Sequence, residues 1–346
     1  MQEGVQMKAV LLKEPGVIDI EEVGLPEADG KVLVKIASVG ICGSDVSAYK
    51  GTSRLGVFPR ILGHEAAGVV VESPREALGL KVGDRVVIEP YRYCGRCYPC
   101  SIGRTNCCEN MSVIGVHQDG AFAEYLAHDF HLVHKVPDEV PWEILALVEP
   151  LTISMQAVKR VGLKEGEHVV VTGAGTIGIL AALYAKHLGG IPILIDPVES
   201  RLEIGRKGGI EYTVNPKKEN SVEAVKDITG GRMAEVVIEA SGSERAVRDT
   251  IDYVSYAGRI SLVGYPYNDV PLPTYLITKK ELDVKGSRNS VGLFEEAIEL
   301  VSEGLINVGV VISATVGFGD FLKYIKELAS NPSSYLKVIA LLDEGA

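Results

Sequence analysis

The sequence predicts an α/β protein with two domains, the first mostly β and the second a doubly wound parallel sheet. Residues 1–150 contain short β-rich runs separated by Gly, Pro and Asp, which is typical of an irregular β domain. After residue 150, strand-like and helix-like patterns alternate, as they do in parallel α/β sheets. The length of 346 residues is sufficient for two cores, because domains usually contain roughly 100 to 200 residues.

The composition is that of a globular protein, with 46% hydrophobic and 23% charged residues. The formal net charge is −11, and no basic run exceeds two adjacent lysines, so nucleic acid is not an expected partner. No apolar run approaches the roughly 18 residues that a membrane helix requires. The first ten residues lack the charged and apolar regions of a signal peptide. We therefore expect a cytoplasmic protein without a membrane partner.

In the first domain, β-rich runs bounded by turn residues predict short strands. These runs cover residues 32–39, 68–72, 85–89 and 122–127. The residue pattern changes from strand-like to helical between residues 137 and 150, where residues 142–148 are apolar at helical spacing. We place the end of the first domain at residue 150.

The second domain, residues 151–286, repeats a unit of one strand followed by one helix, which predicts the doubly wound sheet. The expected strands are 168–172, 191–195, 235–239, 259–263 and 282–286, and the expected helices include 177–188 and 200–207. Residues 287–346 contain two further amphipathic patterns, at 294–305 and 321–328. The pattern alone leaves open which domain this last segment completes.

A glycine-rich turn lies between a predicted buried strand and a predicted helix. It has the form G-x-G-x-x-G, with Gly173, Gly175 and Gly178 as its glycines and Thr176 and Ile177 between the last two. In this context the motif indicates a dinucleotide site, because the glycines permit a tight turn, close approach of a pyrophosphate and packing of the helix on the strand. The alternative is a tight glycine turn without a ligand.

Asp196 favours the dinucleotide interpretation. It ends the next predicted strand about 20 residues after Gly175, where a carboxylate can accept hydrogen bonds from the adenosine ribose. A carboxylate there repels a 2′-phosphate, so the sequence predicts NAD rather than NADP. Arg201 either covers the adenine or solvates a helix face, and Val263, at the end of a later strand, is also assigned to the cofactor site.

Five of the six cysteines fall within fifteen residues, which in a reducing compartment indicates a metal site rather than disulfides. Cys94, Cys97, Cys100 and Cys108 supply four thiolates from a lobe at about residues 90–110. Four sulfur ligands close a tetrahedral zinc site and leave no position for chemistry, so we expect a structural zinc ion. Cys107 is interpreted as an inert neighbour, although spacing alone leaves an exchange with Cys108 open.

A second set of donors lies outside this lobe. One segment supplies a thiolate from Cys42, two residues before Ser44. A separate segment supplies an imidazole and a carboxylate from the adjacent pair His64 and Glu65. Three protein ligands with an open position describe a catalytic zinc site. Each of these residues alone would more often be a packing or surface residue. Their combination in one chain favours a metal site.

These motifs together resemble the zinc-dependent medium-chain dehydrogenase/reductase superfamily, over nearly the whole chain. The resemblance implies a GroES-like catalytic domain, a Rossmann domain at residues 151–286, and a return to the catalytic domain at residues 287–346. It depends on the dinucleotide turn, the four-cysteine lobe and the motifs Cys42-Gly-Ser-Asp45, Gly63-His-Glu-Ala-Ala-Gly68, Gly83-Asp-Arg-Val86, Asp119-Gly-Ala-Phe-Ala-Glu-Tyr125 and Glu149-Pro150.

The resemblance also implies the ligands and cofactors. The catalytic zinc ligands would be Cys42, His64 and Glu65 or a water, with Glu149 as a fourth, direct or water-mediated ligand. One further zinc ion would be structural, NAD would accept the hydride, and the chain would form a homo-oligomer, a dimer or a tetramer.

Proton transfer is expected to begin at Ser44, which would take the proton of the substrate hydroxyl. The family often places a histidine at the end of this relay, and the chain has Ser47 there. From Ser44 the proton would therefore reach bulk water either through the cofactor ribose and another group or through water molecules.

The expected substrate is a small molecule with a secondary hydroxyl group. The stretch Val148-Glu-Pro-Leu151 is similar to that of sorbitol, threonine and sugar-acid dehydrogenases. Arg288, beside Asn289, would clamp a carboxylate of an aldonate such as galactonate or gulonate, or would instead form an interdomain or cofactor salt bridge. His117 would contact substrate hydroxyls or lie in solvent.

Three other functions make different demands on the sequence. A sorbitol-type or threonine-type dehydrogenase would act on a neutral polyol or an amino alcohol. A zinc-free quinone or enoyl reductase would lack both ligand sets. A non-catalytic nucleotide-binding relative would not need Cys42, His64, Glu65 and Asp196.

Overall fold

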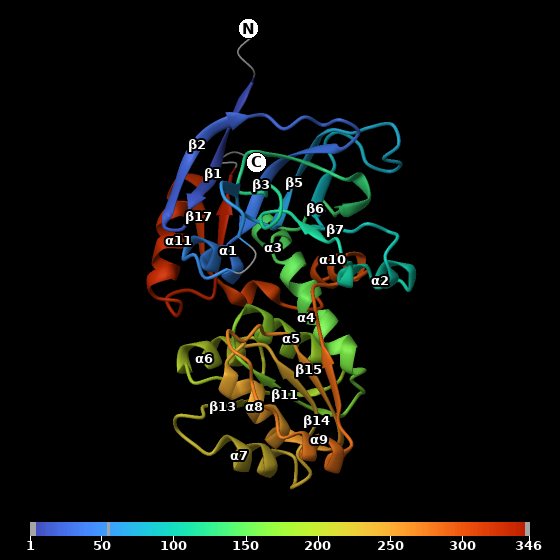
Figure 1. Cartoon of the computed structure of the whole chain (residues 1–346), viewed down its shortest axis with the longest axis vertical. Coiled ribbons are helices and arrows are strands. Elements are labelled where there is room, and N and C mark those ends of the chain that lie inside the picture. The colour runs from blue at the N-terminus through green and yellow to red at the C-terminus, as the bar shows by residue number, and fades with distance from the viewer. Residues whose placement is uncertain (1–4, 54–55, 343–346) are drawn as a thin grey trace. The chain divides into compact units, whose positions relative to one another are not determined.

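The computed structural model describes residues 5–53 and 56–342, which form two compact units (Figure 1). The first unit comprises the chain up to Glu149, Phe294–Ser302 and the segment from Ile312 onward. The second unit comprises Pro150–Leu293 and Glu303–Val311. The chain therefore leaves the first unit near residue 150 and enters it again twice.

A seven-stranded sheet forms the centre of the first unit. Its order is β10 (Val133–Lys135), β6 (Arg85–Ile88), β5 (Glu65–Glu72), β3 (Val32–Gly40), β18 (Lys337–Leu341) and β17 (Ile312–Gly317), with β9 (Tyr125–His128) also paired to β3. Two smaller sheets are β2 (Val17–Gly24), β1 (Gln6–Glu14) and β4 (Arg60–Ile61), and β7 (Tyr91–Arg92) with β8 (Ser112–Val113). The helices are α1 (Gly43–Tyr49), α2 (Tyr98–Ser101), α3 (Trp142–Leu145), α10 (Phe294–Ser302) and α11 (Phe321–Ser330).

The C-terminal residues complete the first unit. Strand β18 pairs antiparallel with β3, and Ile339 lies opposite Gly40. Phe321 of α11 packs edge to face on Phe122, with ring centroids 4.5 Å apart. Because β3 is buried along nearly its whole length, this late pairing encloses the core.

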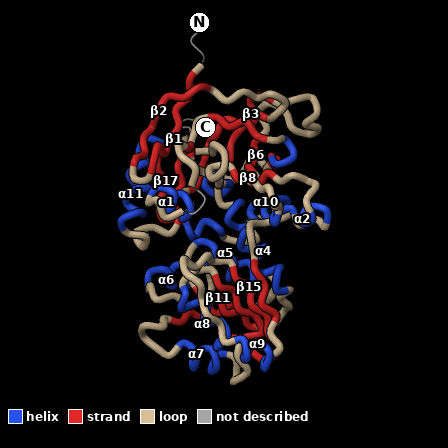
Figure 2. Tube along the Cα trace, in the orientation of Figure 1, coloured by secondary structure: helices blue, strands red, loops and turns tan. Residues whose placement is uncertain are grey.

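The second unit is a six-stranded parallel sheet flanked by helices (Figure 2). The strand order is β13 (Tyr212–Val214), β12 (Ile191–Ile195), β11 (His168–Thr172), β14 (Ala234–Glu239), β15 (Val254–Leu262) and β16 (Asp283–Gly286). The helices are α4 (Val148–Val161), which begins at the end of the first unit, α5 (Thr176–His187), α6 (Glu199–Lys207), α7 (Ser221–Ile228), α8 (Glu244–Tyr253) and α9 (Thr274–Lys280). The winding direction reverses between β11 and β14, which is where open α/β sheets bind ligands.

The predicted fold class is confirmed, with differences at several element ends. The expected strand 122–127 begins only at Tyr125, because the residues before it bond to other segments: Phe122 N donates to Leu62 O at 2.9 Å, and Glu124 N donates to Lys8 O at 3.0 Å. The sequence placed the return to the first unit at residue 287, whereas the chain joins that unit at Phe294. Residues 287–293 stay with the second unit, where Ser287 N donates to Leu262 O at 2.8 Å.

Across the residues that the structure describes, no helix combines the length and the apolar character needed to cross a membrane.

Candidate functional site

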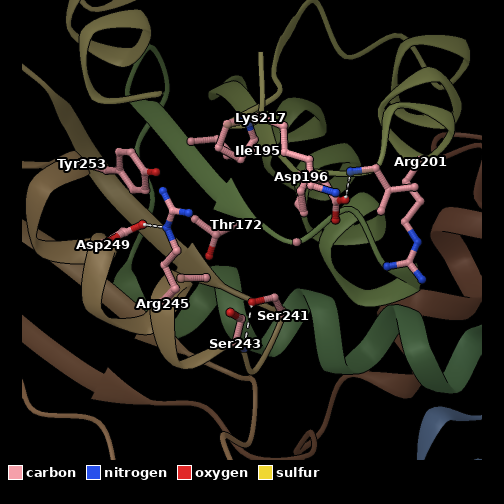
Figure 3. A pocket seen from close by; sticks show the side chains of 15 residues that line it. Thr172, Ile195, Asp196, Arg201, Lys217, Ser241, Ser243, Arg245, Asp249 and Tyr253 are labelled. Carbon is pink, nitrogen blue, oxygen red and sulfur yellow. Dashed lines mark hydrogen bonds and ion pairs between the residues drawn. The ribbon is translucent and has the colours of Figure 1, made fainter. Parts of the chain in front are cut away.

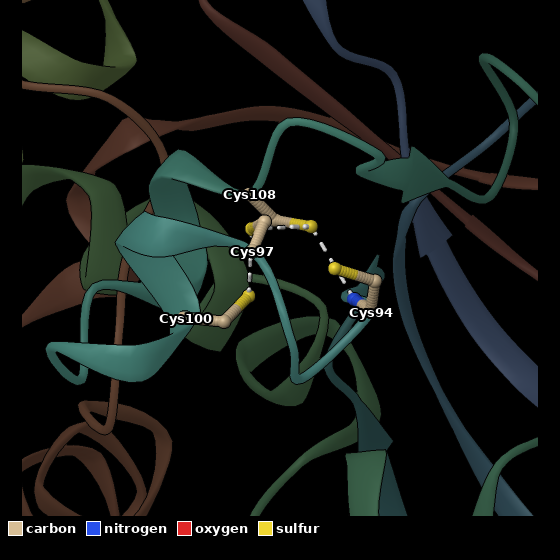
Figure 4. Close-up of side chains that lie close together, drawn as sticks. All are labelled: Cys94, Cys97, Cys100 and Cys108. Atoms are coloured by element: carbon tan, nitrogen blue, oxygen red, sulfur yellow. Dashed lines mark hydrogen bonds between the residues drawn. The ribbon is translucent and has the colours of Figure 1, made fainter.

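The four cysteines of the lobe converge on one point (Figure 4). The sulfur atoms of Cys94, Cys97, Cys100 and Cys108 lie within 4.8 Å of one another. The Cys97 sulfur is 3.4 Å from that of Cys100 and 3.8 Å from that of Cys108. These separations are too long for a disulfide and close to the roughly 3.8 Å expected between sulfurs around tetrahedral zinc. Cys107 lies outside this set of four.

The charges of the lobe also suit a zinc ion. Backbone N–H groups of Arg96 and Cys97 lower the pKa of Cys94 to about 6, which favours a thiolate. Burial and the neighbouring thiols raise the pKa of Cys100 to about 12. Four crowded thiols therefore do not all ionise without a cation between them, and a zinc ion supplies that charge.

The second donor set lies where two central strands meet. Cys42 follows β3 and precedes α1, while His64 and Glu65 stand at the start of β5. The antiparallel register of β3 and β5 places Gly40 opposite Glu65, so the two segments meet at this end of the sheet. Donor atoms of Cys42, His64 and Glu65 all lie within 4.8 Å of one another.

Asp45, in α1, contacts the segments that carry Cys42 and His64. Its Oδ2 accepts a hydrogen bond from Cys42 N at 2.9 Å, and its Oδ1 accepts one from Gly63 N at 3.4 Å. The same Oδ1 is 3.8 Å from His64 Nδ1, a buried nitrogen without a hydrogen-bond partner. A carboxylate behind one imidazole nitrogen orients the other nitrogen toward a metal.

The electrostatics of the second set also indicate a cation. Burial alone would lower the pKa of His64, but the charges of Cys42 and Asp45 outweigh burial and raise the pKa well above its ordinary value. These neighbouring negative groups thus favour a positive charge at the imidazole. A zinc ion among the same donors provides that charge and fits the residues present.

Glu149 stands outside the three converging donors. It lies in the first turn of α4, is 6% exposed, and accepts a hydrogen bond from the Tyr91 hydroxyl. Burial raises the pKa of Glu149 to about 7, while the charge of His64 opposes the rise. Tyr91 was not singled out from the sequence, since its contact joins residues 58 positions apart.

Lys337 is a further residue that the sequence did not indicate. It begins β18, is 3% exposed, and its Nζ lies 2.5 and 2.7 Å from the two carboxylate oxygens of Glu65. The same Nζ donates to Ile41 O at 3.0 Å. Burial lowers the pKa of Lys337, but Glu65 and Cys42 outweigh burial and raise it above its ordinary value. Glu65 is therefore held by a buried cation beside the other two donors.

Ser44 is exposed at the start of α1, two residues after Cys42. Ser44 and Val116 line one small cavity of about 80 Å³ in the first unit. The adjacent His117 accepts a hydrogen bond at Nδ1 from Val113 N at 3.1 Å.

In the second unit, the glycine turn joins β11 to α5 as the sequence predicts. Gly173 has a φ of +95°, and a Cβ at Gly178 would lie 1.8 Å from Gly173 O, so both positions require glycine. Thr176 and Ile177 form the first turn of α5, after Gly175. The turn borders a pocket of about 400 Å³ (Figure 3).

Asp196 lines this pocket with 4% of its surface exposed. Its carboxylate accepts hydrogen bonds from Ala174 N at 2.8 Å and Val198 N at 2.7 Å. It therefore fixes the glycine turn as well as facing the pocket. Arg201 also lines the pocket, together with Lys217 and Arg245 (Figure 3).

The remaining predicted residues follow later strands of the second unit. Val263 comes directly after β15, and its N–H bonds to Glu239 O at 2.9 Å. Arg288 is exposed, and Asn289 is partly buried with a φ of +45°. Their roles toward a substrate stay predictions.

Two family descriptions match the chain. Residues 28–138 match the alcohol dehydrogenase GroES-like domain, and residues 176–303 match the zinc-binding dehydrogenase domain.

Three curated relatives cover most of the chain. An uncharacterized zinc-type alcohol dehydrogenase-like protein of Haemophilus influenzae is 50% identical over 97% of this chain and 99% of its own. L-galactonate-5-dehydrogenase of Escherichia coli is 35% identical, over 90% of this chain and 91% of its own. Sorbitol dehydrogenase of Bacillus subtilis is 33% identical, over 87% of both chains.

Solved structures share the fold over nearly the full length. An alcohol dehydrogenase from Escherichia coli CFT073, complexed with NADH, has a TM-score of 0.91 and 30% identity, covering 98% of this chain and 100% of its own. A zinc-binding dehydrogenase from Sinorhizobium meliloti 1021, bound to NADP, has the same TM-score, identity and coverage. The chain therefore belongs to the zinc-dependent medium-chain dehydrogenase family, as its motifs indicate.

Proposed function

We propose that the protein oxidises a secondary hydroxyl group of a sugar acid or a polyol to a ketone, with NAD as the hydride acceptor. The observation that carries the proposal is the convergence of Cys42, His64 and Glu65 in a chain whose second unit holds a dinucleotide turn with Asp196 at the next strand end. L-galactonate-5-dehydrogenase and sorbitol dehydrogenase among the relatives support this substrate class.

The residues of the first unit would hold the metal and move the proton. Zinc supplies Lewis-acid chemistry, which lowers the pKa of a bound hydroxyl group. Asp45 keeps His64 in one orientation, and Lys337 balances the charge of Glu65. Ser44, which is exposed at the start of α1, would accept the hydroxyl proton and pass its own proton on to solvent. NAD, when bound at the glycine turn, would supply the hydride acceptor.

A substrate panel tests the proposal. The zinc-loaded protein is mixed with NAD and with aldonates, polyols and amino alcohols, and NADH formation is followed by absorbance. NADH formation with an aldonate or a polyol supports the proposal. Turnover only of an amino alcohol would favour a threonine-type dehydrogenase, and no NADH with any substrate would favour a non-catalytic nucleotide-binding protein.

Asp196 is proposed to select NAD over NADP. Replacing it with serine is expected to raise the NADP-to-NAD ratio of kcat/KM about tenfold or more, because the charge that repels a 2′-phosphate is lost. Asp196→Asn should act in the same direction while keeping one oxygen for the backbone N–H groups. Asp249→Asn is the matched control, since that carboxylate lines the same pocket but pairs with Arg245. A wild-type protein with higher kcat/KM for NADP would contradict the assignment.

Arg288 is proposed to bind the carboxylate of an aldonate. Arg288→Ala should raise KM for an aldonate about tenfold, because a bidentate ion pair is lost, and should change KM for the matching polyol far less. Lys285→Ala is the control, since that nearby cation pairs with Asp283 at 3.1 Å. Equal effects of Arg288→Ala on both substrates, or faster wild-type turnover of sorbitol than of every aldonate, would return the proposal to a neutral polyol.

We also propose that the chain forms a homo-oligomer. Strand β16 ends the order of the parallel sheet in the described part of the chain, and such an edge is a template for pairing with a second copy. Light scattering during size-exclusion chromatography should give a mass of at least two chains of 37.1 kDa. A mass of one chain across micromolar concentrations would contradict the proposal.

A further inference from the structure

Glu239 is a carboxylate buried at the carboxyl edge of the parallel sheet. It is the last residue of β14, and its side chain has 0% exposure. Neither the zinc sites nor the adenosine end of the cofactor pocket uses it. Because a buried carboxylate is costly unless it is hydrogen-bonded, its partners are informative.

The partners come from the turn after β14. One carboxylate oxygen of Glu239 accepts hydrogen bonds from Ser241 N at 2.8 Å, Ser241 Oγ at 2.5 Å and Gly242 N at 3.0 Å. Burial raises the pKa of Glu239, and the hydrogen bonds from Ser241, Gly242 and Gly264 oppose the rise. Several donors directed at one carboxylate stabilise its ionised form and fix the turn.

Glu239 also fixes the residues after β15. Its backbone carbonyl accepts hydrogen bonds from Val263 N at 2.9 Å and Gly264 N at 3.1 Å. A Cβ at Gly264 would lie 2.2 Å from Gly242 N and 2.5 Å from Glu239 Oε2. The turn after β14 and the residues after β15 therefore pack directly against each other around this carboxylate.

This clamp, which consists of Glu239, Ser241, Gly242, Val263 and Gly264, supports the dinucleotide turn. A Cβ at Gly173 would lie 2.7 Å from Ser241 Cβ, so Ser241 backs the first glycine of that turn. Ser241 also lines the cofactor pocket.

The clamp lies on the side of β11 away from Asp196. Strand β12, which is directly followed by Asp196, the residue proposed to bind the adenosine ribose, is next to β11 on one side, and β14 and β15 follow on the other. A dinucleotide whose adenosine lies over β12 and whose pyrophosphate lies at the start of α5 must extend its other half over β14 and β15.

We propose that Glu239 is a positioning residue for the nicotinamide half of the dinucleotide, acting through Ser241 and through Val263 and Gly264. This inference rests on the proposed use of NAD. The carboxylate does not touch the cofactor; it sets the surface on which the nicotinamide ribose and ring lie.

The test compares two ligands that share the adenosine end. The dissociation constants of NADH and AMP are measured by fluorescence and calorimetry for the zinc-loaded wild type and Glu239→Gln, a variant of equal size that directs an amide N–H toward donors. The expected result is an NADH dissociation constant raised about tenfold, with that of AMP, which lacks the whole nicotinamide half, changed less than about twofold. KM for NAD should rise and kcat should fall.

A second variant and a control keep the test decisive. Gly264→Ala disturbs the clamp from the opposite strand and should repeat the selective loss of NADH binding. Thr250→Val changes another buried polar group, whose hydroxyl donates within α8 to Val247 O at 2.7 Å, and should leave both dissociation constants unchanged.

The outcomes separate the two proposals. Equal weakening of NADH and AMP binding in folded Glu239→Gln and Gly264→Ala, or no weakening of NADH binding, would overturn the role of Glu239 while leaving NAD use intact. Failure of the wild type to bind NADH would instead overturn the proposed function, and the inference with it.

Discussion

Replacing Cys42 with serine is expected to abolish turnover and to remove one of two zinc ions from each chain. Cys42 supplies the only thiolate of the set it forms with His64 and Glu65. Because a zinc ion contributes several kcal/mol to stabilising charge in the transition state, turnover should fall by about 10³-fold or more. Zinc content by mass spectrometry, with kcat on the best substrate, measures both effects.

Two other cysteines provide the contrast. Cys107→Ser should keep two zinc ions and full turnover, since this thiol lies outside the four-sulfur set. Cys97→Ser should mainly lower the melting temperature, because a structural zinc ion contributes directly to folding free energy. A single zinc ion per chain in fully active wild-type protein would contradict the assignment of two sites.

Replacing Lys337 with methionine is expected to lower the free energy of unfolding by about 3 to 5 kcal/mol, the usual cost of leaving one member of a buried ion pair alone. The lysine and Glu65 are 3% and 2% exposed, so solvent cannot compensate the remaining carboxylate. Ile41 O would also lose a hydrogen-bond donor. Denaturant unfolding of the wild type and the variant, both treated with a zinc chelator, measures the change, because a zinc ion at Glu65 would otherwise compensate its charge.

A double variant that removes both charges tests whether Glu65 is the group that Lys337 neutralises. Lys337→Met combined with Glu65→Gln should recover a substantial part of the lost stability, because the unpaired buried charge is then absent. Lys285→Met, at a partly exposed pair with Asp283, should change the free energy of unfolding by less than about 1 kcal/mol. If the double variant were less stable than Lys337→Met alone, Glu65 would not be the group that Lys337 compensates.

The features predicted from sequence were those encoded locally. The glycine turn needs only a strand, a turn and a helix in succession, and β11, Gly173 and α5 follow one another directly. Cys94 and Cys108 are similarly close in the chain, so their spacing alone indicates a closed metal site. The alternating pattern of the second unit is long and regular, and five of its six strands therefore overlap their expected positions. The three-residue strand β13 was not predicted.

The features that sequence reasoning missed depend on contacts between distant residues. Tyr91 and Glu149 meet because β7 and the start of α4 are brought together by the fold. Lys337 opens an apolar run, Lys337–Leu341, and a lysine in such a run suggests a partner without identifying it. The role of Asp45 needs the position of the Gly63 N–H, which depends on the register of β3 and β5.

The pairing of β18 with β3 also affects the order in which the chain can fold during synthesis. Glu65 emerges from the ribosome 272 residues before its partner Lys337. At roughly 5 to 20 residues per second, the nascent chain would carry this carboxylate without its cation for more than about ten seconds. Nearly all of the second unit is contiguous in sequence and is complete before β18 is made. The nucleotide-binding half can therefore fold on the ribosome first, while Ser38, Val39 and Gly40 of β3 lack their strand partner on one side until β18 arrives.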